Sequence, residues 1–229
     1  MKHFINGLKD SIPIGLSYLS VSFTFGMTGV AQGMPLWVLV LISLTCLTSA
    51  GQFSGLTIIL QNGSLIELAL SQLIINLRYT LMSISLSQKI DPDTTTAERA
   101  IISFGITDEI FALAASKPHK VTKHYMYGLI ILPLFCWTMG TFLGGVATSL
   151  MPMNVRNALN IAIYAMFIAI FVPPAKKERP ILITILIAVA CSYVFTWLNI
   201  SAGFSTIFCT LIAAGVGAWL FPVQEVAHE

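Results

Sequence analysis

Three ionisable residues lie within otherwise apolar stretches of this chain, and their types and spacing could support chemistry there. Arg78 stands in INLRYT, and Asp108 and Glu109 stand side by side at the centre of IISFGITDEIFALAAS, residues 101–116. A charge within a membrane segment costs about 2.5–3.5 kcal/mol on insertion scales, so it usually faces other helices and has a partner. Because Arg78 and Asp108 would lie at similar depths on consecutive antiparallel helices, we expect Arg78 to pair with Asp108 or Glu109.

The two acids are suited to different roles. Side chains of adjacent helical residues point about 100° apart, so Asp108 and Glu109 cannot face Arg78 equally well. One acid could balance Arg78 while the other binds and releases a proton. The alternative is a purely structural ion pair that fixes the register of two helices.

Three further polar or aromatic residues are candidates for a site inside the protein. Asn76 lies two residues before Arg78 and therefore on roughly the opposite side of a helix. Gln52 sits in TSAGQFSG, residues 48–55, whose small side chains allow a helix or a small molecule to come close. A packing face is the more common role of such a segment. Trp137 lies near the middle of an apolar segment, either as a core residue or as part of an apolar binding wall.

The composition indicates which elements must position these residues. Of the 229 residues, 56% are hydrophobic and 10% are charged, and the mean hydropathy is +0.84. A typical globular domain has about one-quarter charged residues. The chain is therefore predicted to be an all-α polytopic membrane protein with about eight transmembrane helices, or seven as the alternative. The eight candidate segments are 12–31, 36–60, 65–87, 101–116, 125–150, 159–172, 180–198 and 202–221.

Some of these helices are predicted to be short or broken, and the N-terminus is predicted to be cytoplasmic. The segments 101–116 and 159–172 are short, and Gly26, Gly29 and Gly105 are candidate breaks. With eight spans, a cytoplasmic N-terminus places eight Lys and Arg residues inside and three outside, as the positive-inside tendency favours. A segment 101–116 that entered and left on one side would conflict with this count, so we expect it to cross.

The chain offers no room for several classes of function. No stretch is long enough for a separate soluble domain, so residues 1–229 are predicted to form a single transmembrane transporter domain. There is no Walker-type phosphate loop, no His-Glu-x-x-His metal site and no Gly-x-Ser-x-Gly nucleophile elbow. The four cysteines are widely separated, and the four histidines lie outside the apolar segments. We expect no metal, no cofactor, no nucleic-acid partner and no enzymatic activity.

Six motifs follow one another along residues 13–221: PIGLSYLSVSFTFG, SAGQF, NLRY, TDEIFAL, a tryptophan followed by GTFLGG, and NIAIYAMFIAIFVP. In their order and spacing they resemble the AzlC-type large subunit of bacterial branched-chain amino acid exporters. The N-x-R and D-E positions of that family match four residues of this chain, namely Asn76, Arg78, Asp108 and Glu109. The sequence departs from the family at Tyr79, where many relatives have histidine.

The resemblance implies export of leucine, isoleucine and valine, and in some members methionine, across the bacterial plasma membrane. It also implies a separate, small AzlD-type membrane subunit as partner. The substrate is a zwitterion with an apolar side chain, so Arg78 could meet its carboxylate, Asp108 or Glu109 its ammonium group, and Trp137 its side chain. The embedded acids motivate the hypothesis of proton antiport. The alternatives are a channel-like or structural subunit, or a carrier for another small zwitterion.

Overall fold

Helices make up the secondary structure of this computed structural model, which describes residues 2–150, 152, 154, 168 and 172–222. Within these residues the exception is an isolated bridge between Ile90 and Val121. The predicted all-α class is therefore confirmed. The chain forms two compact units, one of residues 1–53 and 76–159 and one of residues 54–75 and 160–229. Each unit is described by itself.

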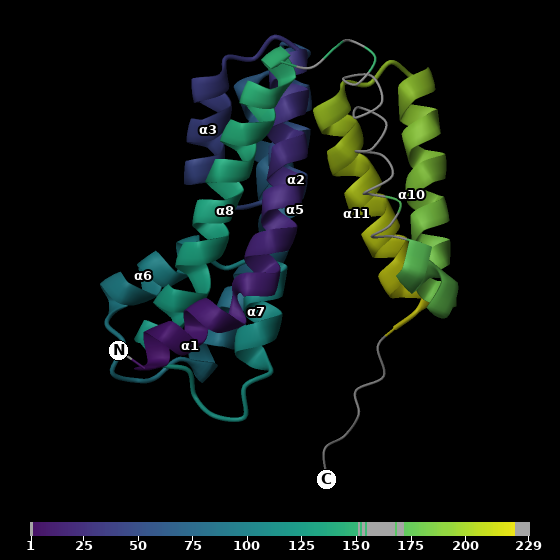
Figure 1. The fold of residues 1–229 in the computed structure, drawn as a ribbon. Coiled ribbons are helices and arrows are strands. Elements are labelled where there is room, and N and C mark those ends of the chain that lie inside the picture. Colours follow the sequence, from purple (N-terminus) through teal and green to yellow (C-terminus); the bar gives the residue numbers. More distant parts are fainter. Residues whose placement is uncertain (1, 151, 153, 155–167, 169–171, 223–229) are drawn as a thin grey trace. The chain divides into compact units, whose positions relative to one another are not determined.

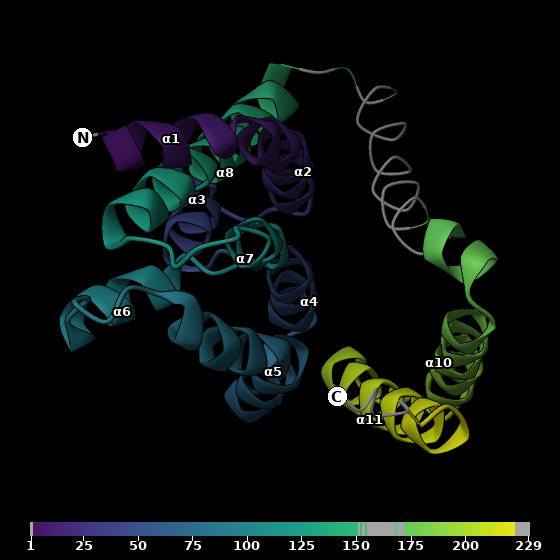
Figure 2. The same cartoon turned by 90° about the horizontal axis from the view of Figure 1, so that it is seen from below.

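Figure 1 shows the order of the helices, and Figure 2 adds the label of α4. The helices are α1 (Lys2–Asp10), α2 (Ile12–Ala31), α3 (Leu36–Thr45), α4 (Ser49–Leu60), α5 (Leu65–Lys89), α6 (Thr96–Phe104), α7 (Asp108–Ala115), α8 (Lys123–Leu150), α10 (Arg179–Trp197) and α11 (Ala202–Leu220).

Five helices among the described residues are long and apolar enough to cross a membrane, as expected of a multi-pass membrane protein. They are α2, α5, most of α8, α10 and α11, and they correspond to the first, third, fifth, seventh and eighth predicted spans. The first agrees with the prediction at both ends. The sixth predicted span, residues 159–172, lies outside the described residues except at positions 168 and 172.

Helices α2 and α8 run parallel and pack through glycines. Gly140 of α8 lies against the backbone of Leu19, and Gly144 lies against the backbone of Phe23 one turn later. Two helix backbones can approach this closely only where the contact residues are small. The GTFLG sequence of α8 is thus a packing face.

Gly26 belongs to the same contact, because a β-carbon on it would collide with the carbonyl oxygen of Thr141. Gly29 makes room for the side chain of Leu39. The expectation that Gly26 and Gly29 break the first helix is wrong, since α2 is continuous. These glycines are needed for close packing.

A single methyl group at this contact is expected to destabilise the protein. In Gly26→Ala the new β-carbon would meet the backbone of Thr141, which cannot move without separating the two helices. Overpacking of this kind typically costs about 1–3 kcal/mol. The free energy of unfolding, measured by denaturant titration in detergent, should fall accordingly. Gly215→Ala in α11 is the control, because an added β-carbon there meets nothing within 4 Å. Equal stability of the two variants would contradict this account.

The second predicted span forms a helical hairpin. Helices α3 and α4 are separated by a break that begins at the extended residue Cys46. Leu39 of α3 packs on Gly29, and the ring of Phe53 in α4 lies 5.4 Å from that of Phe25. Leu39 and Phe53 would be about 21 Å apart in one helix, whereas the positions of α2 that they contact are one turn, about 6 Å, apart. The chain therefore reverses at the break, and the expectation of one continuous helix is wrong.

The fourth predicted span also forms a hairpin, made of α6 and α7. The expected break at Gly105 is confirmed, since this residue ends α6. The backbone N–H of Val121 donates to the carbonyl oxygen of Lys89 at 3.0 Å, and Nζ of Lys89 donates to the carbonyl oxygen of Ala115 at 2.7 Å. The chain before α6 and the chain after α7 thus lie together. The expectation that this segment crosses the membrane is wrong, because it enters and leaves at the same end.

The two hairpins start at opposite ends of α8. Leu36, the first residue of α3, lies against Gly145 near the end of α8. Glu98 of α6 forms an ion pair of 2.7 Å with Lys123, the first residue of α8. In Figure 1, α3 accompanies the upper part of α8, whereas α6 and α7 lie beside its lower part.

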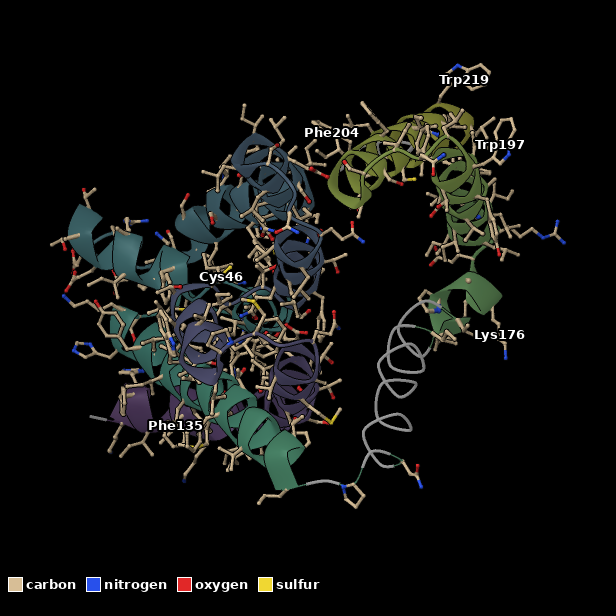
Figure 3. All side chains as sticks on the ribbon, turned by 90° about the horizontal axis from the view of Figure 1, so that it is seen from above. Cys46, Phe135, Lys176, Trp197, Phe204 and Trp219 are labelled. Atoms are coloured by element: carbon tan, nitrogen blue, oxygen red, sulfur yellow. The ribbon has the colours of Figure 1, made fainter. Side chains whose placement is uncertain are left out.

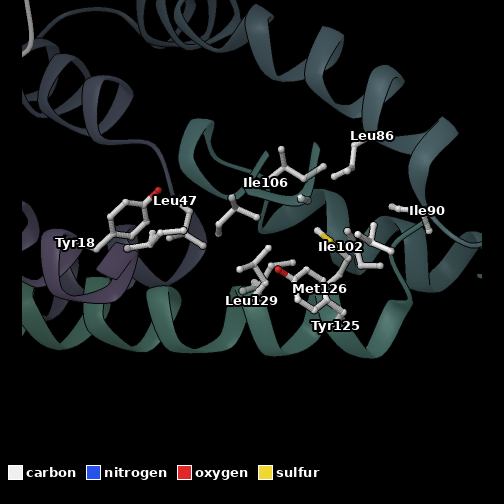
Figure 4. Close-up of a cluster of buried hydrophobic side chains, with 14 of the residues drawn as sticks. Tyr18, Leu47, Leu86, Ile90, Ile102, Ile106, Tyr125, Met126 and Leu129 are labelled. Carbon is white, nitrogen blue, oxygen red and sulfur yellow. The ribbon is translucent and has the colours of Figure 1, made fainter. Parts of the chain in front are cut away.

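The tips of the hairpins meet in one hydrophobic core. Leu47 at the first tip and Ile106 at the second belong to the same buried cluster, together with Ile102, Met126 and Leu129 (Figure 4). Each hairpin follows a spanning helix, either α2 or α5. Because α2 ends where α8 ends and α5 ends where α8 begins, the motif of a spanning helix followed by a hairpin occurs twice in opposite directions.

The second unit contains a buried carboxylate that caps a helix. Glu67 of α5 is 4% exposed and accepts hydrogen bonds from Oγ of Ser201 at 2.5 Å and from the backbone N–H groups of Gly203 and Phe204 at 2.8 and 3.3 Å. These donors belong to the first turn of α11, whose N–H groups lack partners within the helix. Glu67 is an embedded charge that the sequence reasoning missed.

The second unit also exposes aromatic residues at the ends of its helices. Trp197 and Trp219 are 82% and 80% exposed and project outward from α10 and α11 (Figure 3). Tryptophan is enriched where transmembrane helices reach the membrane–water interface. Their positions therefore suit helices that cross a bilayer.

Candidate functional site

Each hairpin tip ends with a threonine that caps the following helix. Thr48 precedes α4, and its Oγ1 accepts a hydrogen bond from the backbone N–H of Gly51 at 3.3 Å. Thr107 precedes α7, and its Oγ1 accepts from the backbone N–H of Ile110 at 3.4 Å. Threonine is a favoured N-cap because its oxygen satisfies a free N–H group at the helix start. The local sequence thus restarts a helix at both tips.

The two threonines also contact polar residues of the spanning helices. The hydroxyl of Thr48 donates to Oδ1 of Asn76 in α5 at 2.8 Å. Oγ1 of Thr107 lies 2.6 Å from the hydroxyl of Tyr18 in α2. Each hairpin is therefore bonded to the spanning helix of the other motif, and the two contacts occupy equivalent places in the inverted pair.

Arg78 and Asp108 form the ion pair that their depths predicted. Nη1 of Arg78 lies 2.9 Å from Oδ2 of Asp108, which is the first residue of α7. The helix dipole favours an acidic residue at this position. The two side chains are 46% and 41% exposed. Because charges facing lipid are very costly, we expect the exposed side of this pair to meet water or another polar surface.

Glu109, the second acid, contacts α2 instead of Arg78. The hydroxyl of Tyr18 lies 2.5 Å from Oε2 of Glu109 and 2.6 Å from Oγ1 of Thr107. Tyr18 is the donor in both contacts, so its single hydroxyl proton is shared between Glu109 and Thr107. The two neighbouring acids thus have separate partners, as the 100° angle between them indicated.

A buried polar network connects the first tip to α8. Nε2 of Gln52 donates to Oγ of Ser43 at 3.1 Å, and Nε1 of Trp137 donates to Oε1 of Gln52 at 2.7 Å. Gln52 and Trp137 are 3% and 2% exposed. The Trp137 ring packs edge-on against Tyr18, with 5.1 Å between the ring centroids. Tyr18 therefore links this network to Glu109 and the second tip.

The six residues singled out from the sequence lie in the first unit, around the two hairpin tips. The residues that connect them were not anticipated: they are Tyr18, Ser43, Thr48, Thr107 and Thr141. Oγ1 of Thr141 lies 2.7 Å from Oγ of Ser43. One signal could have identified the tips. An apolar residue followed by threonine occurs at both, as Leu47-Thr48 and Ile106-Thr107, within segments too short or too rich in small residues for a regular span.

Comparison with known families identifies the family to which the chain belongs. A family model described as AzlC protein matches residues 13–151, which include both hairpins, α2, α5, α8 and all six predicted residues. The chain is a member of the AzlC family.

Relatives support the AzlC assignment across most of the chain. The inner membrane protein YgaZ of Escherichia coli is 27% identical over 79% of this chain and 77% of its own length. An uncharacterized membrane protein of Archaeoglobus fulgidus is 31% identical over 77% of this chain and 78% of its length, and one of Helicobacter pylori is 27% identical over 85% and 89%. No solved structure matches this AzlC chain significantly.

Proposed function

We propose that this AzlC-family protein exports branched-chain and other hydrophobic amino acids, together with a small AzlD-type membrane subunit and coupled to protons. The observation that carries the proposal is the Arg78–Asp108 ion pair, with Glu109 beside it, at the tip of a hairpin that ends inside the protein. It supports a carrier more than a structural subunit, because partly exposed charges at this depth are costly unless they serve a polar ligand.

The chemistry of the pair fits a zwitterion. An amino acid presents a carboxylate that Arg78 can bind and an ammonium group that Asp108 or Glu109 can bind. A zwitterion inserted between Arg78 and Asp108 would leave every charge neutralised, so the pair could open without exposing a bare charge. Trp137 and Gln52 would then form the apolar and polar sides of the space for the substrate side chain. The process involves no covalent step.

The inverted hairpins support transport by alternating access. Carriers built from inverted repeats often place discontinuous helices around a site near the middle of the membrane. Here the Thr48–Asn76 contact holds the tip of one hairpin and the Thr107–Tyr18 contact holds the tip of the other, and the two hairpins start at opposite ends of α8. Opening one contact while the other stays closed would give the site access to one side of the membrane at a time.

The distribution of basic residues supports a cytoplasmic N-terminus in a bacterial inner membrane. The first unit groups seven Lys and Arg residues at the end where α8 begins. They are Lys2 and Lys9 of α1, Lys89 at the end of α5, Arg99 of α6, Lys117 and Lys120 after α7, and Lys123 at the start of α8. Such clusters remain on the cytoplasmic side. Lys89 and Arg99, which the eight-span interpretation placed outside, join this cluster because neither hairpin crosses.

Efflux of labelled leucine tests the proposal. Cells that lack their own exporters would express this chain with and without a small AzlD-type subunit, and efflux should require both. Efflux of another labelled zwitterion, but not of leucine, would show that the protein carries a different substrate. Absence of any efflux, with both proteins shown to be in the membrane, would favour a non-transporting structural subunit.

A further inference from the structure

A cleft of about 310 Å³ lies between α1, the segment 117–122 and the first turn of α8. It contains none of the residues of the hairpin tips. Basic and hydrogen-bonding side chains dominate its lining, among them His3, Lys117, His119, Lys120 and Tyr125. The cleft lies where the chain enters its first spanning helix, so it belongs to the interfacial region of the protein.

One wall of the cleft is held in place by a compact network. Asp10 accepts a hydrogen bond from Nζ of Lys117 at 2.7 Å and one from the hydroxyl of Tyr125 at 2.9 Å. The hydrogen bond from Lys117 keeps the pKa of the Asp10 carboxyl below its ordinary value, so this carboxyl stays ionised and the pair is neutral. Gly7 and Gly128 bring the backbones of α1 and α8 into contact, which fixes α1 against the rest of the unit.

Most of the remaining lining side chains are basic or able to donate a hydrogen bond. Among the residues that the structure describes, Asp10 is the only acidic one that lines the cleft, and Lys117 compensates its charge. Lys120 forms no ion pair within the described part of the chain. The imidazoles of His3 and His119 each offer at least one N–H donor in either protonation state. An anion with several oxygen atoms would therefore meet a preformed set of donors.

We propose that this cleft binds a phosphate group, carried either by an anionic lipid headgroup or by a free phosphate compound. Phosphate offers several strong acceptors, and juxtamembrane lysines attract anionic lipids. The amphipathic helix α1, with Lys2 and Lys9 exposed beside Ile5, is suited to lie at the membrane surface and to bring the cleft to the level of the headgroups.

Native mass spectrometry of the purified protein with phosphatidylglycerol tests this site. Lys120→Gln, which removes a charge, and His119→Ala, which removes an N–H donor, should each weaken retention of a bound lipid by about fivefold, the effect of one lost contact to the headgroup. Lys177→Gln is the matched control, because it removes the same charge at an exposed position that lies neither in the cleft nor on α1. Retention in the control should stay within about twofold of the wild type.

Inorganic phosphate in a competition arm distinguishes the two sources. If millimolar phosphate does not displace bound phosphatidylglycerol, the cleft is a lipid site. If millimolar phosphate displaces the lipid, the cleft is a site for a free phosphate compound. Equal loss of lipid in Lys120→Gln and Lys177→Gln would overturn the proposal, because it would mean that overall charge and not the cleft holds the lipid. Failure here would leave the amino acid export test unaffected.

Discussion

Arg78→Ala is expected to reduce amino acid efflux by about 10-fold to 100-fold, the effect of losing one hydrogen-bonding partner of a charged group. Arg78 is paired with Asp108 at 2.9 Å and is the only basic residue within the described spanning helices away from their ends. Without it, the substrate carboxylate loses its partner and Asp108 is left uncompensated. Initial rates of leucine efflux, normalised to the amount of protein in the membrane, measure this effect.

Arg99→Ala provides the matched control for this variant. Arg99 is also an arginine of the first unit, but it donates to the backbone carbonyl groups of Ser87, Asp91 and Thr94 near the start of α6. Its loss should change efflux by less than about threefold, because it has no access to the substrate. If Arg78→Ala transports as well as Arg99→Ala, the ion pair has only a structural role.

Glu109→Gln is expected to remove the dependence of efflux on the proton gradient, with the protein still inserted in the membrane. The amide keeps the shape of the side chain and can still accept from Tyr18 at 2.5 Å, but it cannot take up or release a proton. Dissipating the pH gradient with an ionophore should then leave the residual efflux unchanged, whereas wild-type efflux should fall. A wild-type response in Glu109→Gln would exclude this acid as the coupling group and direct attention to Asp108→Asn.

Tyr18→Phe separates the contact with Glu109 from the packing around it. Phenylalanine keeps the edge-on contact with Trp137 but removes the hydroxyl that joins Glu109 and Thr107. Leucine efflux should therefore decrease while insertion and stability stay close to wild type. Unchanged efflux would mean that Tyr18 acts through its ring alone.

The sequence allowed good prediction of where apolar helices begin and end. Charged residues bounded the first span before Ile12, and the uncharged turn sequence QGMP bounded it after Ala31. The pairing of Arg78 with Asp108 could also be predicted, since an embedded charge demands a partner and few were available. Both predictions depend on local composition and on the cost of burying charge.

The path of the chain inside the membrane could not be predicted in this way. An apolar segment that reverses has the same composition as one that crosses, and the helices on both sides of Cys46 are uniformly apolar. The reversal is decided by contacts between distant residues, such as Val121 with Lys89. The count of basic residues was also misleading, because Lys89 was assigned to a side by assuming that a segment before it, residues 36–60, crosses. Tyr18 was missed for the same reason, since its role depends on a partner 89 positions away.

The half-length hairpins have a consequence for the biosynthesis of the protein. Helices α3, α4, α6 and α7 contain 10, 12, 9 and 8 residues, fewer than the roughly 17–25 needed to cross the hydrocarbon core. Unpaired backbone groups at their tips are tolerated at membrane depth only when protein surrounds them. We therefore expect each hairpin to reach its final position only once α8 has been made, because α8 is part of the protein that surrounds both tips.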